Sequence, residues 1–317
     1  MLDNINLDPD APVLVIGAAS IDIVGKLQGE LQHGTSNPAH IRTSFGGTAR
    51  NVAENLARLG LEVHLLTAIG KGTIGNQLLK HSANAGVNTD HIIRTTQRPT
   101  GSYLAMVDQQ GELQFALDDM RAITALTPEY LQQNQNLFEE SGVLFLDANL
   151  PADTLETALE LASKADLLVC ADPTSAPLAS RLRPYLPNLF LLTPNSAEAA
   201  VLTDHPVANS EEEQGLQAAK RLVAQGVDFA IVTLAEFGVC YATSEVSGHI
   251  PAIRTKIIDP TGGGDALSAA VIFALLNNIP ADEAVRLGVS AASLTLQHSG
   301  AVLPDLSLEA LYDHLSV

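Results

Sequence analysis

Basic residues are scarce in this sequence. The 317 residues include 17 Lys and Arg against 36 Asp and Glu, which gives a formal net charge of −19 at pH 7. A surface that binds nucleic acid needs clustered positive charge, because contacts to the phosphate backbone supply most of the affinity. The composition therefore argues against nucleic acid as a partner.

Cysteines are also rare, and long apolar runs are absent. Cys170 and Cys240 both lie in apolar, strand-like runs without metal-ligand spacing, so we interpret them as core thiols of a reducing compartment. The acidic start, Met1–Asp10, lacks the apolar core of a signal peptide, and no run reaches the length that spans a membrane. These absences predict a cytoplasmic protein with no membrane partner.

The apolar residues that are present fall into short runs separated by helical stretches. Strand-like runs such as Val143–Leu146 and Leu167–Ala171 alternate with helical patterns and end in polar residues. An earlier run, Pro12–Gly17, is continuously apolar, which is typical of a buried parallel strand. We predict an α/β fold, a doubly wound and mainly parallel sheet with helices on both faces. The length suits one large domain, 1–317, or two modest ones.

The stretch Asp259–Ala266 gives the strongest indication of a site. The strand-like run Ala252–Ile258 leads into it, and an apolar helical run follows. Consecutive glycines let backbone N–H groups converge at the start of a helix, where the helix dipole adds positive potential, so the turn can form an anion hole. Its glycines are Gly262, Gly263 and Gly264. A carboxylate at Asp265 can take a proton from a hydroxyl bound there. The alternative is a glycine-rich turn with an N-capping Asp.

A second glycine turn, Gly46-Gly47, opens another predicted helix, which carries Asn51 near its start and ends at Gly60. Two glycines at a helix start again expose N–H groups and let a ligand approach closely. Asp22 lies just past the first predicted strand, where α/β proteins bind ligands. The alternative for Asp22 is an ordinary turn residue.

The two glycine turns resemble the signatures of a known family. Asp-x-Thr-Gly-x-Gly-Asp, at 259–265, is similar to the C-terminal signature of the ribokinase-like (PfkB) sugar and nucleoside kinases, which usually have Ala in place of Gly263. Gly46, Gly47 and Asn51 match the N-terminal signature Gly-Gly-x-x-x-Asn. The resemblance covers about the whole chain, and it implies that these three residues and Asp22 contact the sugar.

Two further segments match the nucleotide side of this family. Asn195 and Glu198 fit its Asn-x-x-Glu motif, which implies that they place Mg²⁺ and the phosphates of ATP, largely through water. The alternative is ordinary helix capping, because Asn is a good N-cap and an acid suits the first turn. Thr233 and Gly238 match a Thr…Gly hairpin that lies beside the nucleotide in the family.

The resemblance also implies a mechanism. Asp265 acts as the base toward a primary hydroxyl, and the backbone N–H groups of the glycine turn stabilise the charge on the transferred phosphoryl group. Many family members also use a monovalent cation such as K⁺ beside the anion hole. If this chain does so, the expected ligands are Asp259 and the carbonyl of Thr261, together with backbone near Ser299–Ala301.

Two polar, β-like segments interrupt the main pattern, at about 25–44 and 92–119. Gln109-Gln110-Gly111 in the second segment is typical of a hairpin turn. Family members use such a small sheet as a lid over the sugar and often as a dimer clasp. A lid excludes water that would otherwise accept the phosphoryl group. We therefore expect a lid and, through it, a possible homodimer.

Arg50, directly before Asn51, indicates a branch of the family. Ribokinases and fructokinases usually have a small residue there, whereas Arg is associated with pseudouridine kinases, so we expect Arg50 to help bind pseudouridine. The alternative is a solvated helix Arg. Ribose, another nucleoside or a hexose such as fructose remain open as substrates, and a catalytically silent sugar-binding relative is a hypothesis of another class.

The segment Gly70–Gly75 fits G-x-G-x-x-G, which on its own indicates a nicotinamide cofactor. It follows the second predicted strand rather than the first, and Asp90 is too near for the usual ribose carboxylate. An oxidoreductase is therefore a distant third hypothesis. The kinase family has Asp where Gly72 stands, so the role of that Asp is missing here.

Overall fold

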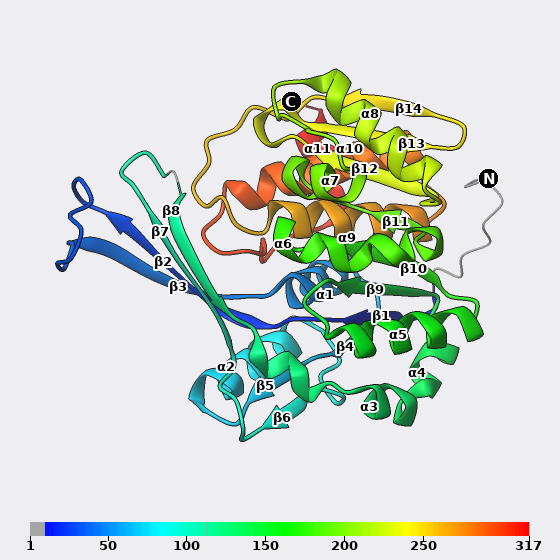
Figure 1. Cartoon of the computed structure of the whole chain (residues 1–317), viewed down its shortest axis with the longest axis horizontal. Coiled ribbons are helices and arrows are strands. Elements are labelled where there is room, and N and C mark those ends of the chain that lie inside the picture. The colour runs from blue at the N-terminus through cyan, green and yellow to red at the C-terminus, as the bar shows by residue number, and fades with distance from the viewer. Residues whose placement is uncertain (1–9, 112, 317) are drawn as a thin grey trace.

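The main sheet has eight strands and forms the centre of the molecule (Figure 1). The structure, a computed structural model, describes residues 10–111 and 113–316, so most of Met1–Asp10 lies outside the described residues. In spatial order the strands are β14 (Ser247–Ile250), β13 (Val239–Thr243), β12 (Phe229–Thr233), β11 (Leu191–Leu192), β10 (Leu168–Asp172), β9 (Val143–Asp147), β1 (Val13–Ile16) and β4 (Val63–Leu66). All neighbouring pairs from β4 to β12 are parallel, and the last two are antiparallel.

Helices cover both faces of this sheet, as predicted. β1 shows why its run is continuously apolar: Val13 and Val15 pack into one core, while Leu14 and Ile16 pack into the other. The first core also takes residues from α1 (Thr48–Arg58), α2 (Thr73–Asn84), α9 (Gly263–Leu276), α10 (Ala281–Leu296) and α11 (Leu308–Leu315). The second takes residues from α3 (Pro128–Gln133), α4 (Gln135–Glu140), α5 (Ala152–Lys164), α6 (Ala176–Ala179), α7 (Ser196–Thr203) and α8 (Glu212–Ala224). Short 3₁₀ turns are η2 (Arg121–Ala125), η3 (Ser180–Asn188) and η4 (Ala235–Phe237).

A four-stranded sheet extends away from the main body (Figure 1), and we call it the lid. Its strands, in spatial order, are β3 (Ala39–Gly46), β2 (Ser20–Leu27), β7 (Gly101–Val107) and β8 (Leu113–Asp119). The first lid segment is longer than the predicted 25–44 because the pairing of β2 with β3 runs from Ser20↔Gly46 to Leu27↔Ala39. In the second segment, β6 (Ile93–Thr95) does not join the lid but pairs with β5 (Ala68–Gly70) in a separate sheet.

The prediction of a strand at Ala252–Ile258 is wrong. The chain leaves the main sheet at the end of β14, and residues 251–257 form neither helix nor strand. Pro251 follows β14 directly and has no N–H for further pairing, while Ile257 and Ile258 are more than half exposed (57% and 55%). The glycine turn is therefore reached by an extended connection that carries two exposed isoleucines.

The predictions made from the two cysteines and from the lack of long apolar runs can be compared with the structure. Cys170 and Cys240 are buried, free thiols in β10 and β13, as expected of core residues. Over residues 10–111 and 113–316, the helices are too short or too polar to cross a bilayer.

Candidate active site

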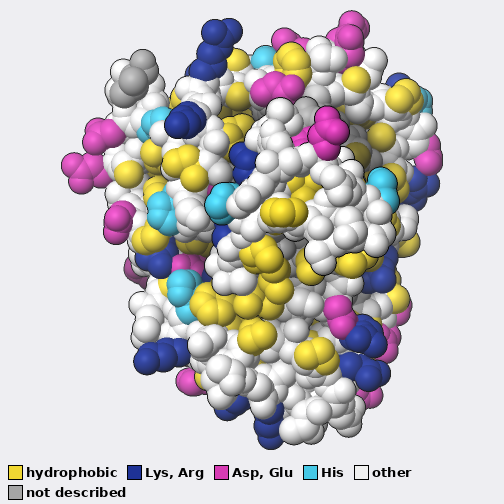
Figure 2. Space-filling view, turned by 90° about the vertical axis from the view of Figure 1, so that its left-hand side faces the viewer, with side chains coloured by type: hydrophobic (Ala, Val, Ile, Leu, Met, Phe, Trp, Pro, Cys, Tyr) yellow, Lys and Arg dark blue, Asp and Glu magenta, His cyan; other side chains and the backbone are white. Residues whose placement is uncertain are grey.

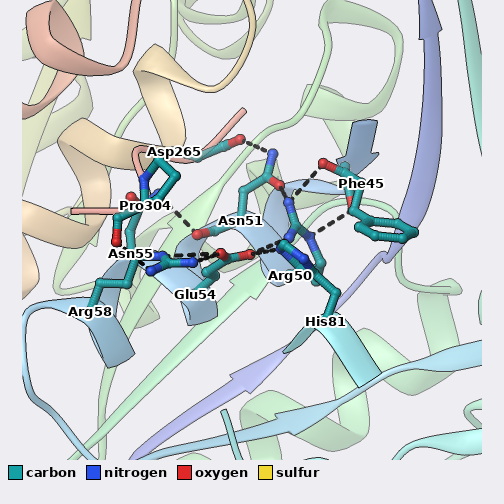
Figure 3. Close-up of polar contacts among 10 residues, drawn as sticks. Phe45, Arg50, Asn51, Glu54, Asn55, Arg58, His81, Asp265 and Pro304 are labelled. Carbon is teal, nitrogen blue, oxygen red and sulfur yellow. Dashed lines mark hydrogen bonds and ion pairs between the residues drawn. The ribbon is translucent and has the colours of Figure 1, made fainter. Parts of the chain in front are cut away.

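The two glycine turns meet beside the carboxyl ends of the parallel strands. α1 follows the turn Gly46-Gly47, and α9 begins in the turn after Asp259. A hydrogen bond joins them: the side-chain amide of Asn51 donates from Nδ2 to Oδ2 of Asp265 at 2.6 Å (Figure 3). Residues that are 214 positions apart in the sequence therefore form one site.

The turn before α9 has the geometry of an anion hole. Gly262 has φ 81°, a left-handed conformation that favours glycine, and a Cβ there would collide with the carbonyl of Ala301. The first N–H groups of a helix have no partner within the helix, so those that follow Gly262 remain available to a ligand. Gly264 borders open space, because a Cβ at this position would meet no atom within 4 Å.

Asp265 lies in the first turn of α9 with a strongly shifted pKa. Burial raises the pKa of this carboxyl to about 7, and the nearby carboxylates of Asp22 and Asp147 add to the rise. The hydrogen bond from Asn51 and the charge of Arg50 act in the opposite direction but do not cancel the effect of burial. A carboxylate whose pKa is near neutral is well matched to accept a proton from a hydroxyl.

Arg50 is buried behind Asn51 and does not extend into solvent. Its side chain is 1% exposed and donates to the carbonyls of Gly46 and Phe45, at 3.2 and 2.8 Å. It also donates to Oδ1 of Asn51 and pairs with Glu54 (Figure 3). Since Oδ1 of Asn51 accepts from Arg50, its Nδ2 must point to Asp265. Arg50 is therefore not a solvated helix residue, and its place suits positioning of Asn51 rather than direct contact with a ligand.

Glu54 anchors Arg50 on the next turn of α1. Although burial opposes it, hydrogen bonds from His81 and Arg58 and the charge of Arg50 lower the pKa of Glu54 to about 2. Arg58 donates from Nη2 to Oε1 of Glu54 at 2.6 Å and does not contact Asn51. Glu54 thus remains ionised and holds the buried guanidinium in place. Arg50, Glu54 and Arg58 are spaced four residues apart in the sequence, which indicates ion pairs along a helix. The burial of Arg50 and Glu54 could not be inferred from this spacing.

Asp22 and the first glycine pair form a second close-packed corner. Asp22 lies in β2 rather than in a turn, and it is buried, with Ser20 donating to Oδ1 at 3.0 Å. Burial raises its pKa. A Cβ at Gly46 would collide with the Asp22 carboxylate, and one at Gly47 would come within 2.6 Å of Ala19 Cα. Both glycines are therefore required by the packing of the protein itself.

Two aspartates at strand ends belong to the site and were seen in the sequence only as polar strand ends. Asp147 is the last residue of β9 and is fully buried; its Oδ2 accepts from the backbone N–H groups of Ala18 at 2.8 Å and Ala49 at 3.1 Å. It thereby ties the end of β1 to the start of α1. Asp172 ends β10, and its pKa is raised well above the ordinary value by burial and by the carboxylates of Glu198 and Asp265.

Asn195 and Glu198 form a capping box at the start of α7. Both oxygens of the buried Glu198 accept from Asn195, its Oε2 from the backbone at 2.8 Å and its Oε1 from the side chain at 2.7 Å. Backbone pairing places Asn195 beside Thr233 at the end of β12. Gly238, with φ 96°, closes the turn after β12, and a Cβ there would collide with backbone after β14.

The carboxylates of Asp172 and Glu198 suit a cation that is shared with phosphate. Over residues 10–111 and 113–316, neither forms an ion pair with a basic side chain, and burial together with the nearby carboxylate of Glu198 raises the pKa of Asp172. The described residues contain no cluster of three or more His, Cys, Asp or Glu arranged to hold a metal alone. Mg²⁺ fits such a place because it keeps several waters and takes few protein ligands.

Asp259 lies against Thr261 and Gly300. Oδ1 of Asp259 accepts from Thr261, from the backbone at 3.0 Å and from the hydroxyl at 2.7 Å, while Oδ2 accepts from the N–H of Gly300 at 2.9 Å. A further partner was not expected: Arg42 from the lid lies 2.6 Å from Oδ1. No local pattern in the sequence indicates this contact between distant segments.

Close packing accounts for Gly70 and Gly75 of the segment Gly70–Gly75, but not for Gly72. The hydroxyl of Thr100 accepts from the N–H of Gly70 at 3.1 Å, and a Cβ at Gly75 would come within 2.9 Å of the same hydroxyl. Gly72 precedes α2, and a Cβ there would meet nothing within 4 Å. The motif thus forms a tight contact with the strand that begins at Gly101, which supports discounting a nicotinamide site here.

Comparisons with known proteins agree with this geometry. The family description pfkB family carbohydrate kinase matches residues 10–307. A pseudouridine kinase of Escherichia coli strain K12 is 33% identical over 297 residues, covering 93% of this chain and 94% of that protein. A guanosine-inosine kinase of Exiguobacterium acetylicum is 29% identical, covering 94% of this chain and 99% of that protein. A crystal structure of ribokinase from Thermotoga maritima has a TM-score of 0.81 and 26% identity, covering 97% of this chain and 100% of that one. The predicted ribokinase-like fold is confirmed.

The shifted pKa of Asp265 predicts a pH-dependent cost in stability. The pKa of this carboxyl is about 7 in the folded protein and 3.8 in its ordinary state, so the folded protein binds the proton more tightly than the unfolded chain does. The resulting contribution to the free energy of unfolding is fully present below pH 3.8 and is lost as the pH rises through 7. We expect Asp265→Asn to have a higher melting temperature than the wild type at pH 8, because the variant avoids the free-energy cost of burying an ionised carboxylate. Each 1 kcal/mol of that cost corresponds to roughly 2–4 °C. The difference should shrink at pH 5.

Thermal unfolding at both pH values, followed by circular dichroism, measures this effect. Asp313→Asn is the matched control because Asp313 is exposed on α11. An Asp265→Asn variant that melts below the wild type at pH 8, or differs from it equally at both pH values, contradicts the assignment.

Proposed function

Because the chain belongs to the pfkB family of carbohydrate kinases, we propose that it transfers the γ-phosphoryl group of ATP to a primary hydroxyl of a nucleoside, namely the 5′-hydroxyl of pseudouridine. The observation that carries this proposal is the contact between Asn51 and Asp265 at the start of α9. It sets a carboxylate with a near-neutral pKa beside a glycine turn that can bind an anion.

The chemistry follows from this arrangement. Asp265 takes the proton of the substrate hydroxyl as the hydroxyl oxygen forms a bond to the γ-phosphorus. The bond from that phosphorus to the oxygen bridging the β- and γ-phosphates breaks, and ADP leaves. The N–H groups of Gly263 and Gly264 and the dipole of α9 stabilise the charge on the phosphoryl oxygens. Asn51 holds the carboxylate of Asp265 toward the hydroxyl.

We assign the nucleotide side to the ends of β10–β12. Asn195, Glu198 and Asp172 would hold Mg²⁺ through water, and Thr233 and Gly238 would border the nucleotide. When bound with ATP, Mg²⁺ neutralises phosphate charge. Burial and the negative charges of Glu198 and Asp265 raise the pKa of Asp172, and a bound Mg²⁺ would offset the repulsion between these carboxylates. The need for a cation at two buried carboxylates is the physical argument for this assignment.

We assign the acceptor side to Asp22 and the turn Gly46-Gly47, under the lid. Ser44, Asp22, Tyr103 and Asp118 are paired across the four lid strands, so they lie in one row on one face. Arg42, two residues before Ser44 on the same face of β3, lies 2.6 Å from Asp259 at the start of the glycine turn, so this face looks onto the site. Within one kinase domain over 1–317, the lid would exclude water from the phosphoryl group.

The pseudouridine assignment is supported by the 33% identical relative and by Arg50. Arg50 contacts Asn51 and would act through it. Arg50 therefore supports a kinase more strongly than it supports selection of one nucleobase. A guanosine- or inosine-type nucleoside, or a free sugar such as ribose or fructose, is the alternative, as in the relatives named guanosine-inosine kinase and ribokinase. A catalytically silent relative is opposed by the paired and intact Asp265.

The test is ADP release from Mg-ATP with pseudouridine, uridine, guanosine, ribose and fructose. We expect turnover with pseudouridine and a decline in kcat/KM below about pH 7, where Asp265 becomes protonated. Asp265→Asn should lower turnover by about a hundredfold to ten-thousandfold, the usual contribution of a general base. Turnover with ribose or fructose alone discards the nucleoside assignment. Binding without turnover on any substrate favours the silent relative.

Arg50 provides a second test, because it acts through Asn51. Arg50→Gln frees the Asn51 amide to rotate, so we expect kcat to fall about tenfold or more while KM for ATP changes little. Arg50→Lys should recover only part of this loss, since Lys lacks the planar fork of donors. Arg58→Gln is the matched control, because Arg58 pairs with Glu54 but not with Asn51. Equal losses from Arg50→Gln and Arg58→Gln would mean that only the Glu54 anchor matters.

The outer face of the lid supports a homodimer. Ile41, Leu104, Phe115 and Leu117 are 40–71% exposed, and strand pairing places Leu104 opposite Leu117. These side chains alternate with the row that contains Asp22, so they lie on the face away from the site. Figure 2 views the molecule from the lid side and shows hydrophobic side chains gathered there. A second copy of the same sheet would cover such a patch.

Light scattering on a size-exclusion column tests this proposal. We expect a dimer for the wild type and a monomer for Leu117→Glu, because a charge in the covered patch is costly. Val246→Glu is the matched control, since Val246 is 52% exposed in the hairpin between β13 and β14. A monomeric wild type would refute the homodimer.

A further inference from the structure

An arginine of the lid reaches the base of the anion hole. Arg42 lies in β3 two residues before Ser44, so it shares the face of the lid that carries Asp22. Its Nη2 lies 2.6 Å from Oδ1 of Asp259. The Arg42 side chain is 32% exposed, whereas that of Asp259 is 1% exposed. The lid therefore supplies a partly solvated cation to a fully buried carboxylate.

Asp259 braces the segments that form the anion hole. It accepts from Thr261 at the start of the glycine turn and from Gly300 on the facing segment. Gly262 packs directly against Ala301 of that segment. Ser44 of the same strand lies near that segment, since a Cβ at Gly300 would lie 3.9 Å from Ser44 Cβ. The lid strand β3 thus contacts Asp259 through Arg42 and passes close to Gly300.

The donors around Asp259 oppose the binding of a metal ion. An ionised carboxylate offers about four lone-pair sites. Oδ1 of Asp259 accepts from the N–H and hydroxyl of Thr261 and lies against the guanidinium of Arg42, and Oδ2 accepts from the N–H of Gly300. A monovalent cation at Oδ1 would have to displace one of these three donors, and a cation at Oδ2 would lie beside a guanidinium of the same charge. The residues present therefore do not fit the K⁺ site that the sequence suggested.

The charge of Asp259 nevertheless has to be neutralised. The glycine turn must attract phosphate, and an uncompensated buried carboxylate next to it would repel phosphate and would itself be costly to bury. A guanidinium remains protonated at any pH at which the protein is folded. Arg42 meets this requirement without any bound ion.

We propose that Arg42 supplies from the lid the positive charge that a monovalent cation would bring to Asp259, so that turnover does not require K⁺. The inference rests on the proposed kinase function. Arg42 is a positioning residue: it acts on the transferred phosphoryl group through Asp259 and the turn that Asp259 braces. Because β3 carries it, the anion hole acquires its full positive potential only when the lid is in contact with the site.

The experiment compares turnover in KCl and in choline chloride at equal ionic strength. We expect wild-type turnover to agree within about twofold in the two salts, since its charge is already compensated. Arg42→Ala should lose about tenfold or more in choline chloride, because a buried carboxylate is left without its partner. K⁺ should restore much of that loss by taking the vacated place. Arg42→Lys, which keeps the charge, should respond to K⁺ less than Arg42→Ala.

Lys26→Ala is the matched control, because Lys26 is an exposed cation of β2 on the same lid sheet and does not contact Asp259. We expect no K⁺ response from it. A wild type that needs K⁺ overturns the proposal, as does an Arg42→Ala variant that is unimpaired or impaired equally in both salts. Arg42→Gln, with a longer neutral side chain, replaces Arg42→Ala if the latter does not fold.

Thermal unfolding in the same two salts tests whether Arg42 replaces K⁺ at Asp259, and it requires no turnover. We expect K⁺ to raise the melting temperature of Arg42→Ala above its value in choline chloride and to leave the wild type unchanged. A wild type stabilised by K⁺ as strongly as the variant overturns the proposal. This measurement remains valid if none of the substrates is phosphorylated, so a failure of the proposed kinase function can be told apart from a failure of the Arg42 assignment.

Discussion

Buried carboxylates at one edge of the sheet must all find partners, and this constraint shapes the rest of the structure. Asp147 is satisfied by backbone N–H groups, and Asp259 by a turn, a facing segment and a lid arginine. Asp265 has a single side-chain donor, Asn51, and burial raises its pKa to about 7. The one hydrogen bond from Asn51 does not offset the burial of Asp265, so this carboxyl can exchange its proton near neutral pH.

The partners of these carboxylates also fix the geometry. Asp147 draws the end of β1 to the start of α1, which leaves space only for glycine at Gly17, since a Cβ there would come within 2.8 Å of Ala49. Gly46 is confined in the same way by the carboxylate of Asp22. The packing of the protein itself thus requires glycine at Gly17 and Gly46, whether or not a ligand is bound. The backbone of the site is therefore preorganised before any substrate binds.

The sequence allowed much of this to be predicted, because the signals are local. Continuous apolar runs predicted parallel strands, and two glycine turns predicted helix starts with exposed N–H groups. The prediction of a strand at Ala252–Ile258 is wrong because Pro251 ends the pairing after β14 and Ile257 and Ile258 face solvent, which periodicity alone does not reveal. The contacts of Arg42 with Asp259 and of Asn51 with Asp265 join distant segments, and no local pattern encodes them. The part of Arg50 in substrate binding stays a prediction, and its burial, which excludes the solvated alternative, could not be inferred from the sequence.

The lid brings two opposite charges to the site on adjacent strands. Asp22 on β2 adds a carboxylate that raises the pKa of Asp265, while Arg42 on β3 adds a guanidinium at Asp259. Because β2 and β3 are paired throughout, neither charge can arrive without the other. Lid contact would therefore strengthen the base and the anion hole in one movement, since a higher pKa makes Asp265 a better proton acceptor and a compensated Asp259 no longer repels phosphate. The hydrogen-bonded pairing of β2 with β3 holds the two charges in a fixed relation to each other, which an unpaired loop would not do.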